Sequence, residues 1–315
     1  MRKIRNLLWV GFLILPFFVF ACGDGDGGGT APPVEPPEET PPSVSLSWPN
    51  DQQLVGGMMT AESQVFDDKG IGKVELLIDD VVIAIDTSGK QGVYHIDFNV
   101  DALATGTHTL KAQATDNSGN INFSTVEVKV DPVELRAQAL QFLRDFNARR
   151  NSDGTISGEL TRWESMPLIV EVSPEILQDG YLEEVKKATD FWTKYTDIPF
   201  EVRAGDVNQV NPMTGKDGVI YIQYGGLGID PGSNGTEWNK MGEGYTIQAS
   251  IIALRKVPLY LSLLAHELGH ALPLGHTGQA STIMTSNFLR MDPVVAQAMK
   301  ILYFELVPGS QVPSS

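Results

Sequence analysis

The alternation of hydrophobic and polar positions divides the chain into a strand-rich first part and a mixed second part. Between residues 44 and 131, short runs alternate apolar and polar side chains, which is the period of a strand with one buried face. Turn-forming residues separate the runs, as in Asp67-Asp68-Lys69-Gly70. The runs cover Val44–Trp48, Val74–Ile78, Val81–Ile85, Tyr94–Val100, Thr107–Ala114 and Asn122–Val130. About seven short strands in this segment predict an antiparallel β-sandwich.

The hydrophobic pattern changes after Asp131, where strand and helix periods alternate. Asp131-Pro132 opens a helical stretch, Val133–Arg150, whose apolar side chains fall on one stripe. Asp292 and Pro293 have the residue types of a helix N-cap and a first helical residue. Between the first helical stretch and Asp292, the pattern predicts several further elements. They are strands at Leu168–Val172, Phe200–Arg203, Val219–Ile222 and Thr246–Leu254, helices at Tyr181–Tyr195 and Leu259–Leu272, and a glycine-rich loop at 225–244. This order predicts an α/β domain with one mixed sheet.

The first residues have the composition of an export signal. A basic start precedes an apolar run, Leu7–Phe20, and the small residue Ala21, which predicts a signal peptide over residues 1–21. A transmembrane anchor is the alternative, but the run is short for a membrane span and Pro16 interrupts it. Residues 22–43 are rich in glycine and then in proline, so we expect a tether without a fold.

The single cysteine of the chain, Cys22, directly follows this signal. The stretch Val19-Phe20-Ala21-Cys22 resembles a bacterial lipobox, and the resemblance implies that Cys22 carries a lipid. We therefore expect an exported lipoprotein that is anchored to a membrane of the bacterial cell envelope. The alternative is cleavage by an ordinary signal peptidase, with an incidental cysteine.

Composition narrows the classes of function. The 315 residues carry a formal net charge of −16, which argues against a nucleic-acid partner because phosphate binding needs clustered lysine and arginine. One cysteine excludes an intramolecular disulfide and a multi-cysteine metal site. The five histidines are few, and three of them lie between positions 266 and 276.

Residues 266–276 read His-Glu-Leu-Gly-His-Ala-Leu-Pro-Leu-Gly-His. His266 and His270 stand one helical turn apart on a predicted helix, so both imidazoles project from one face and can bind one ion. Glu267 can reach a metal-bound water as a general base without being a ligand. His276 follows where the chain has left the helix. Three neutral imidazoles with one open position are typical of a catalytic zinc site.

This string resembles the extended zinc motif of the metzincin metallopeptidases, in which a third histidine completes the ligand set. Ser281-Thr-Ile-Met284 resembles their Met-turn, and the likeness is closest to matrixin-type enzymes over about residues 160–305. The resemblance implies a zincin-like catalytic domain that binds one Zn²⁺ through the three histidines. It also implies peptide-bond hydrolysis with Glu267 as the general base and Met284 as a support beneath the metal.

The sequence departs from the matrixin pattern after the second histidine. Pro273 stands where the family has the glycine of a sharp left-handed turn, and proline holds φ near −65°, so we expect Gly275 to take the turn. Ser286 stands where some metzincins have a tyrosine ligand, and we expect no ligand there. Asp292 is the alternative third ligand, but its place before Pro293 predicts an N-cap.

Two further parts of the site are assigned from the pattern. The C-terminal domain has no further histidine to stabilise an oxyanion, and Tyr245 is the candidate helper. The predicted strand Thr246–Leu254 is the candidate sheet edge for pairing with an extended peptide.

The stretch Gly106–Asn120 resembles the last hairpin of bacterial immunoglobulin-like (Ig-like) domains, which implies an Ig-like sandwich. For Asp116 and Asn117 we expect a satisfied turn, with a Ca²⁺ site as the alternative. We therefore expect five segments: a signal peptide (1–21), a tether (22–43), an Ig-like β-sandwich (44–131), a helical connector (132–160) and a metzincin-like peptidase domain (161–315).

The predicted function is that of a zinc-dependent endopeptidase acting on protein or peptide substrates. The predicted partners are such a substrate and a membrane, reached through the lipid on Cys22, and no nucleic acid. The alternative is a lipid-anchored surface binding or adhesion protein whose metallo domain is inactive. The intact Glu267 argues against this alternative, because loss of that carboxyl group is the simplest route to inactivity.

Overall fold

The computed structural model describes residues 40–88, 91–150, 156–211, 215–226, 228–229, 233–276, 282–285 and 288–313. Residues Glu39–Ser315 form one compact unit. The predicted signal peptide, Cys22 with its expected lipid, and most of the tether lie outside the described residues, as do Ser281 and Ser286. Within the described ranges, no helix has the length and apolar character needed to cross a membrane.

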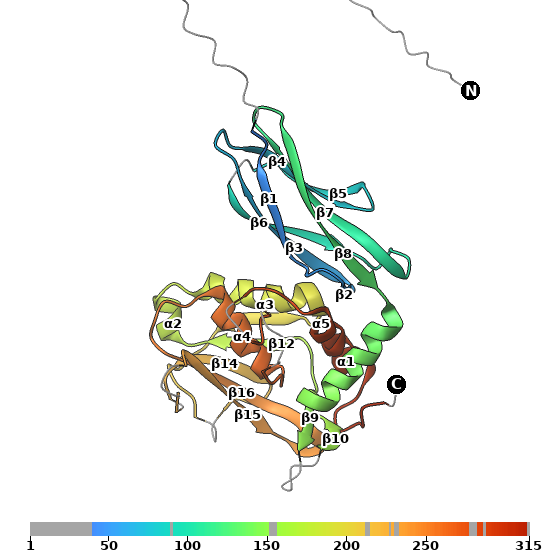
Figure 1. The fold of residues 1–315 in the computed structure, drawn as a ribbon. Coiled ribbons are helices and arrows are strands. Elements are labelled where there is room, and N and C mark those ends of the chain that lie inside the picture. Colours follow the sequence, from blue (N-terminus) through green and yellow to red (C-terminus); the bar gives the residue numbers. More distant parts are fainter. Residues whose placement is uncertain are drawn as a thin grey trace, which may run out of the picture. The chain divides into compact units, whose positions relative to one another are not determined.

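The N-terminal domain is a β-sandwich of two sheets (Figure 1). Its strands are β1 (Ser43–Trp48), β2 (Gln53–Val55), β3 (Met58–Phe66), β4 (Ile71–Ile78), β5 (Val81–Asp86), β6 (Gly92–Asn99), β7 (Gly106–Asp116) and β8 (Ile121–Val130). One sheet has the order β1-β3-β6 and the other the order β2-β8-β7-β4-β5. Neighbouring strands are antiparallel, except for the parallel pair β2 and β8.

The predicted sandwich is confirmed, although the sequence pattern does not predict β2 and β3. Inward-facing apolar side chains such as Leu76, Phe98 and Leu110 form the core between the sheets. Strand β3 buries Ala61 and Ser63 at two of its inward positions. Small and polar residues at these positions weaken the alternation that marks a strand.

The C-terminal domain contains a mixed sheet with the strand order β11-β16-β14-β12-β13, and β15 pairs with β16. Its strands are β11 (Arg162–Trp163), β12 (Leu168–Val172), β13 (Phe200–Ala204), β14 (Val219–Tyr224), β15 (Gly235–Met241) and β16 (Thr246–Leu254). All these pairs are parallel except β15–β16, which is antiparallel. The expected α/β arrangement with one mixed sheet is therefore present.

Strand β15 corrects two predictions. It lies within residues 225–244, where the glycine-rich composition predicts only a loop, so that prediction is wrong for its second half. The prediction that Thr246–Leu254 is an exposed edge is also wrong, because β16 is largely buried and pairs with both β14 and β15. Among the described strands, β15 pairs with β16 alone and forms that edge of the sheet.

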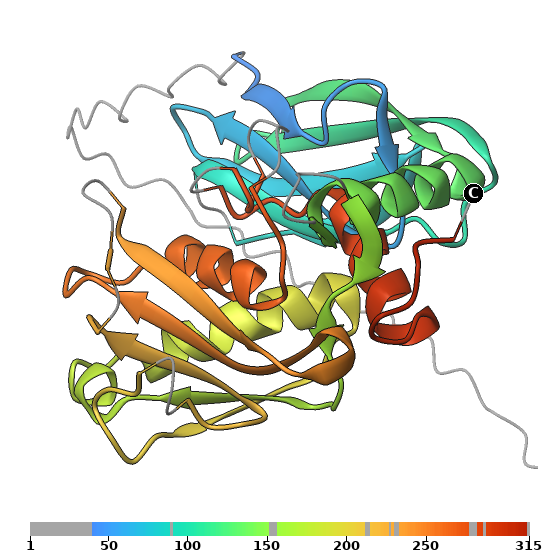
Figure 2. The ribbon, with the colours of Figure 1, turned by 90° about the horizontal axis from the view of Figure 1, so that it is seen from below.

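Helices α3 (Leu182–Thr196) and α4 (Leu261–Ala271) pack against each other and cover one face of the sheet (Figures 1 and 2). The other helical segments of this domain are α2 (Pro174–Gln178), the 3₁₀ turn η1 (Glu243–Tyr245), α5 (Pro293–Lys300) and the π-helical turn η2 (Ile301–Glu305). Helix α4 is the element that carries the first two histidines of the motif.

The predicted connector is built into the C-terminal domain. Helix α1 (Pro132–Phe146) begins after the N-cap Asp131 and packs against α5. Its side chains Ala139 and Leu143 belong to the hydrophobic core of the C-terminal domain. It ends earlier than predicted, because residues Ala148–Arg150 form β9, which pairs with β10 (Ile156–Leu160). The predicted helical stretch Val133–Arg150 is therefore wrong only in its last turn.

Candidate metal centre

The three histidines of the motif converge on one point. His266 and His270 project from the same face of α4, and His276 comes from the segment that follows the helix. The Nε2 atom of His266 lies 3.1 Å from Nε2 of His270 and 3.1 Å from Nε2 of His276. The structure thus brings all three predicted ligands together, and among the described residues they form a group able to hold a metal ion.

Backbone carbonyl groups fix the two helical imidazoles. Nδ1 of His266 lies 2.6 Å from the carbonyl oxygen of Ile283, and Nδ1 of His270 lies 2.7 Å from that of Leu274. A carbonyl oxygen only accepts hydrogen bonds, so in both imidazoles Nδ1 carries the proton and donates it. Each Nε2 is left with a lone pair that faces its neighbours, which is the arrangement of metal-binding histidines.

These nitrogen atoms fit a metal ion. The unprotonated Nε2 atoms of His266 and His270 lie 3.1 Å apart and repel each other, and a cation held between them removes the repulsion. Zinc bonds of about 2.0–2.1 Å in tetrahedral geometry separate the nitrogen atoms by about 3.3 Å, close to the separations found here. Burial lowers the pKa of His270 to about 4 and also lowers the pKa of His266, so both are neutral at pH 7.

Glu267 lies beside the histidines in the wall of a pocket of about 290 Å³, which is lined also by Gly235, Thr236 and Glu237 of β15. Burial raises the pKa of the Glu267 carboxyl group to about 7. A Cβ atom on Gly235 would lie 2.4 Å from Oε1 of Glu267. Glycine at this position therefore gives the carboxyl group the space it occupies.

Glu237 is a second buried carboxyl group of this pocket, and the sequence analysis missed it. Its Oε1 is buried without a hydrogen-bond partner among the described residues. Burial raises the pKa of Glu237 to about 8, with a further contribution from the neighbouring Glu267. The residue reaches the pocket through the pairing of β15 with β16, opposite Ile252, and no local spacing in the sequence signals this.

Met284, the methionine of the predicted Met-turn, is fully buried and lies against α4. A Cβ atom on Gly269 would lie 2.3 Å from Sδ of Met284 and 2.8 Å from Cζ2 of Trp192. Trp192 of α3 also donates a hydrogen bond from Nε1 to the Ala265 carbonyl oxygen, at 2.8 Å. The small Gly269 thus lets both side chains contact the helix that carries the ligands.

The turn after α4 falls at Pro273. Its φ is 22°, whereas Gly275 is not in the left-handed region, so the prediction that Gly275 takes the turn is wrong. The pyrrolidine ring favours φ near −65°, and Pro273 is therefore a strained position directly before Leu274, which holds His270.

The structure also shows the positions of three other residues for which the sequence predicts a role. Asp292 caps α5 and accepts a hydrogen bond from the Val294 amide at 2.8 Å, which confirms the N-cap. Tyr245 lines a different pocket, with Thr161 and Met241, so its prediction as an oxyanion helper is wrong. Asp116 accepts hydrogen bonds from backbone amides of its own turn, including that of Ser118 at 2.8 Å, as a satisfied turn requires.

Comparison with known proteins assigns the N-terminal domain. A family model described as "Bacterial Ig domain" matches residues 42–112. The sandwich is a bacterial Ig-like domain. The match covers only the first residues of the stretch Gly106–Asn120 on which the sequence resemblance rests, and it ends before the C-terminal domain begins. A search of curated proteins finds no match to this chain.

Solved structures give only partial likenesses to this chain. The fibronectin(III)-like modules of CbhA from Clostridium thermocellum are 21% identical over 29% of this chain and 47% of theirs, with a TM-score of 0.24. The endo-β-1,4-mannanase from Thermotoga petrophila is 18% identical over 30% of this chain and 20% of its own, with a TM-score of 0.26. The chain thus spans less than half of either structure, and neither supports an argument about function.

Proposed function

We propose that the C-terminal domain is a zinc-dependent endopeptidase of the metzincin type, acting on protein or peptide substrates. The observation that carries the proposal is the convergence of three histidine Nε2 atoms beside the buried carboxyl group of Glu267, in one pocket. His266, His270 and His276 would hold the ion. A closed structural site would offer four protein ligands, whereas these three leave a position open.

Bound Zn²⁺ supplies a Lewis acid that acidifies a water molecule and polarises a peptide carbonyl group. Glu267 accepts a proton from the attacking water and delivers it to the departing amine. Glu267 can take both roles because its carboxyl group lines the same pocket as the three histidines. Strand β15 borders the pocket, and on the side away from β16, where no described strand pairs with it, it can pair with an extended peptide.

The test compares zinc content with cleavage in the purified full chain. We expect about one zinc per chain by inductively coupled plasma mass spectrometry, and cleavage of casein. Glu267→Gln should retain zinc but cleave at least about 100-fold more slowly, because the general base is lost. The exposed Glu243 provides a control, since Glu243→Gln should change neither zinc content nor cleavage.

Two results would contradict the proposal. Cleavage that is undiminished in Glu267→Gln would remove the general base from the mechanism, and a wild-type chain without zinc would remove the metal. Zinc retained by a wild-type chain that cleaves no substrate would instead favour a binding protein with an inactive metallo domain.

A further inference from the structure

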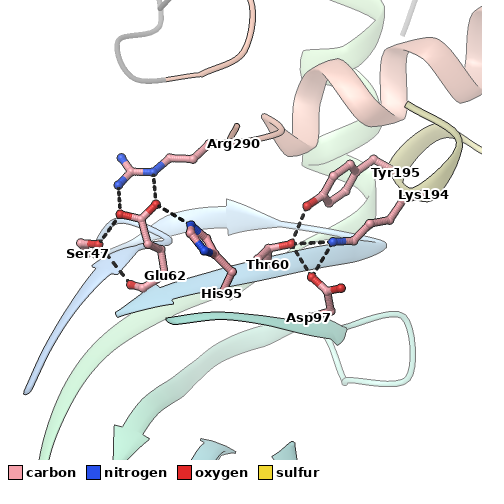
Figure 3. A network of polar contacts seen from close by, with 8 residues as sticks. All are labelled: Ser47, Thr60, Glu62, His95, Asp97, Lys194, Tyr195 and Arg290. Carbon is pink, nitrogen blue, oxygen red and sulfur yellow. Dashed lines mark hydrogen bonds and ion pairs between the residues drawn. The ribbon is translucent and has the colours of Figure 1, made fainter. Parts of the chain in front are cut away.

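The Ig-like domain contacts the C-terminal domain through a network of polar side chains, shown in Figure 3. Both domains belong to the one compact unit Glu39–Ser315. The network joins Ser47, Thr60, Glu62, His95 and Asp97 of strands β1, β3 and β6 to Lys194, Tyr195 and Arg290. It has two branches, and each leads to a segment that contacts the metal-binding helix.

The first branch is a bidentate ion pair between Arg290 and Glu62. Arg290 donates from Nε to Oε2 of Glu62 at 3.1 Å and from Nη2 to Oε1 at 2.6 Å. Each side chain is only 14% exposed. Ser47 donates a further hydrogen bond to Oε1 of Glu62 at 3.0 Å, and the guanidinium group lies over the rings of Trp48 and Phe288. A bidentate pair shielded from water in this way holds the arginine in one position.

Arg290 continues this branch to a metal ligand through its backbone. Its carbonyl oxygen accepts a hydrogen bond from the Ile283 amide at 2.9 Å. The carbonyl oxygen of Ile283 in turn accepts the hydrogen bond from Nδ1 of His266, at 2.6 Å. Arg290 is therefore linked to the proposed ligand His266 by two hydrogen bonds through a single residue, Ile283. Ile283 directly precedes Met284 in the chain.

The second branch reaches α4 through α3. Lys194 donates a hydrogen bond to Thr60 at 3.0 Å and pairs with Asp97, and the hydroxyl groups of Tyr195 and Thr60 are hydrogen-bonded. Trp192 lies on the same helix and donates to Ala265, the residue before His266. The sheet β1-β3-β6 thus contacts both segments that support α4 next to His266, namely α3 and the segment from Ile283 to Arg290.

We propose that the Ig-like domain is a positioning part of the metal centre, in which Glu62 fixes Arg290 and, through Ile283, the imidazole of His266. The inference rests on the proposed function, because it assigns the Ig-like domain a role at that site. Glu62 contacts neither metal nor substrate, so it is a positioning residue. Without it, Arg290 keeps a largely buried charge that has lost its partner, and the backbone at Ile283 loses its anchor.

The first readout does not depend on a metal. In the full chain, the Ile283 amide is followed by hydrogen–deuterium exchange in the variant Glu62→Gln. We expect this amide to exchange about 10-fold faster than in the wild type, because local opening becomes easier. Glu127→Gln is the matched control. It makes the same change at an exposed glutamate of the Ig-like domain whose side chain bonds Gln52 rather than the network, and exchange at Ile283 should stay unchanged.

The second readout is the metal centre itself. We expect Glu62→Gln to weaken zinc binding by about 10-fold in chelator competition, the size seen when the hydrogen-bond support of a ligand is disturbed. The visible spectrum of the Co²⁺-loaded chain should also change, since it reports the ligand geometry. If Glu62→Gln does not fold, Arg290→Lys serves in its place, because lysine keeps the charge but loses the fork of donors.

The outcomes separate the two proposals. A wild-type chain that binds no zinc overturns the proposed function. A wild-type chain that binds zinc, with Glu62→Gln and Arg290→Lys leaving Ile283 exchange, zinc affinity and the Co²⁺ spectrum unchanged, overturns only the positioning role of the Ig-like domain. Equal effects in Glu62→Gln and Glu127→Gln would also overturn it, because they would reflect general destabilisation of the sandwich.

Discussion

At the scale of single residues, the pKa of the Glu237 carboxyl group is far from its usual value. Its pKa is raised from 4.5 to about 8 by burial and by Glu267. Between these two values the native state keeps a proton that the unfolded chain releases, so this group lowers the free energy of unfolding progressively as pH rises. At pH 8 and above, the native state holds an unfavourable buried carboxylate.

The variant Glu237→Gln tests this dependence because it keeps the shape of the side chain and removes its titration. In metal-free protein we expect its melting temperature to exceed that of the wild type at about pH 8.5 and to differ little near pH 5. Differential scanning calorimetry measures both, with the exposed Glu243→Gln as control. A difference that is the same at both pH values would contradict the assignment.

The chemistry-bearing residues differ in how far the sequence can predict them. His266, Glu267 and His270 lie within two turns of one helix, so local spacing places them on one side, and His276 follows soon after. Glu237 and Arg290 come from other segments and reach the centre through strand pairing and backbone hydrogen bonds. No period in the sequence expresses such contacts, so these residues were not predictable.

At the scale of elements, the turn after α4 gives a direct prediction. Pro273 has a φ of 22°, which suits glycine and strains proline. We expect Pro273→Gly to raise the free energy of unfolding by about 1 kcal/mol, and the melting temperature by about 2 °C for a protein of this size. Calorimetry of the metal-free chain measures this.

Gly275→Ala is the matched control for the turn. Gly275 is outside the left-handed region, and an added Cβ atom would meet Phe146 at an ordinary 3.8 Å. The melting temperature should therefore remain unchanged. A stable Pro273→Gly chain with no gain, together with a destabilised Gly275→Ala chain, would place the turn at Gly275 after all.

The elements that the sequence predicts well are those whose buried side chains are mostly apolar. Strand β12 has its predicted bounds, and α3 follows the expected stripe of Val185, Ala188 and Trp192. Strands β3 and β15 escape prediction because their inward positions hold small or polar residues, such as Ala61 and Ser63 in β3 and Glu237, whose Oε1 atom is buried, in β15. The period that marks a strand is then set by pairing with its neighbours rather than by hydrophobicity.

At the scale of the whole molecule, the contact between the domains depends on pH. Burial raises the pKa of Glu62, but hydrogen bonds from Arg290 and Ser47, together with nearby positive charge, outweigh it, so the pKa lies below 4.5. A lowered carboxyl pKa stabilises the native state above pH 4.5, and this contribution is lost as pH falls through the native value.

We therefore expect Glu62→Gln to melt at a lower temperature than the wild type at pH 7, and this difference to shrink steadily below pH 4.5. Calorimetry of both chains across this range gives the comparison. A difference that does not change with pH would show that the ionised carboxyl group of Glu62 adds nothing to the contact.

The interface in Figure 3 limits how this chain can be recombined. A module that served only as a spacer could be exchanged for any Ig-like domain of similar length. Here a replacement must also present a carboxyl group opposite Arg290 and another opposite Lys194. Gene fusions that separate the two domains would leave Arg290 without its partner Glu62. The sandwich and the metal-binding domain should therefore be expressed and engineered together as a single unit.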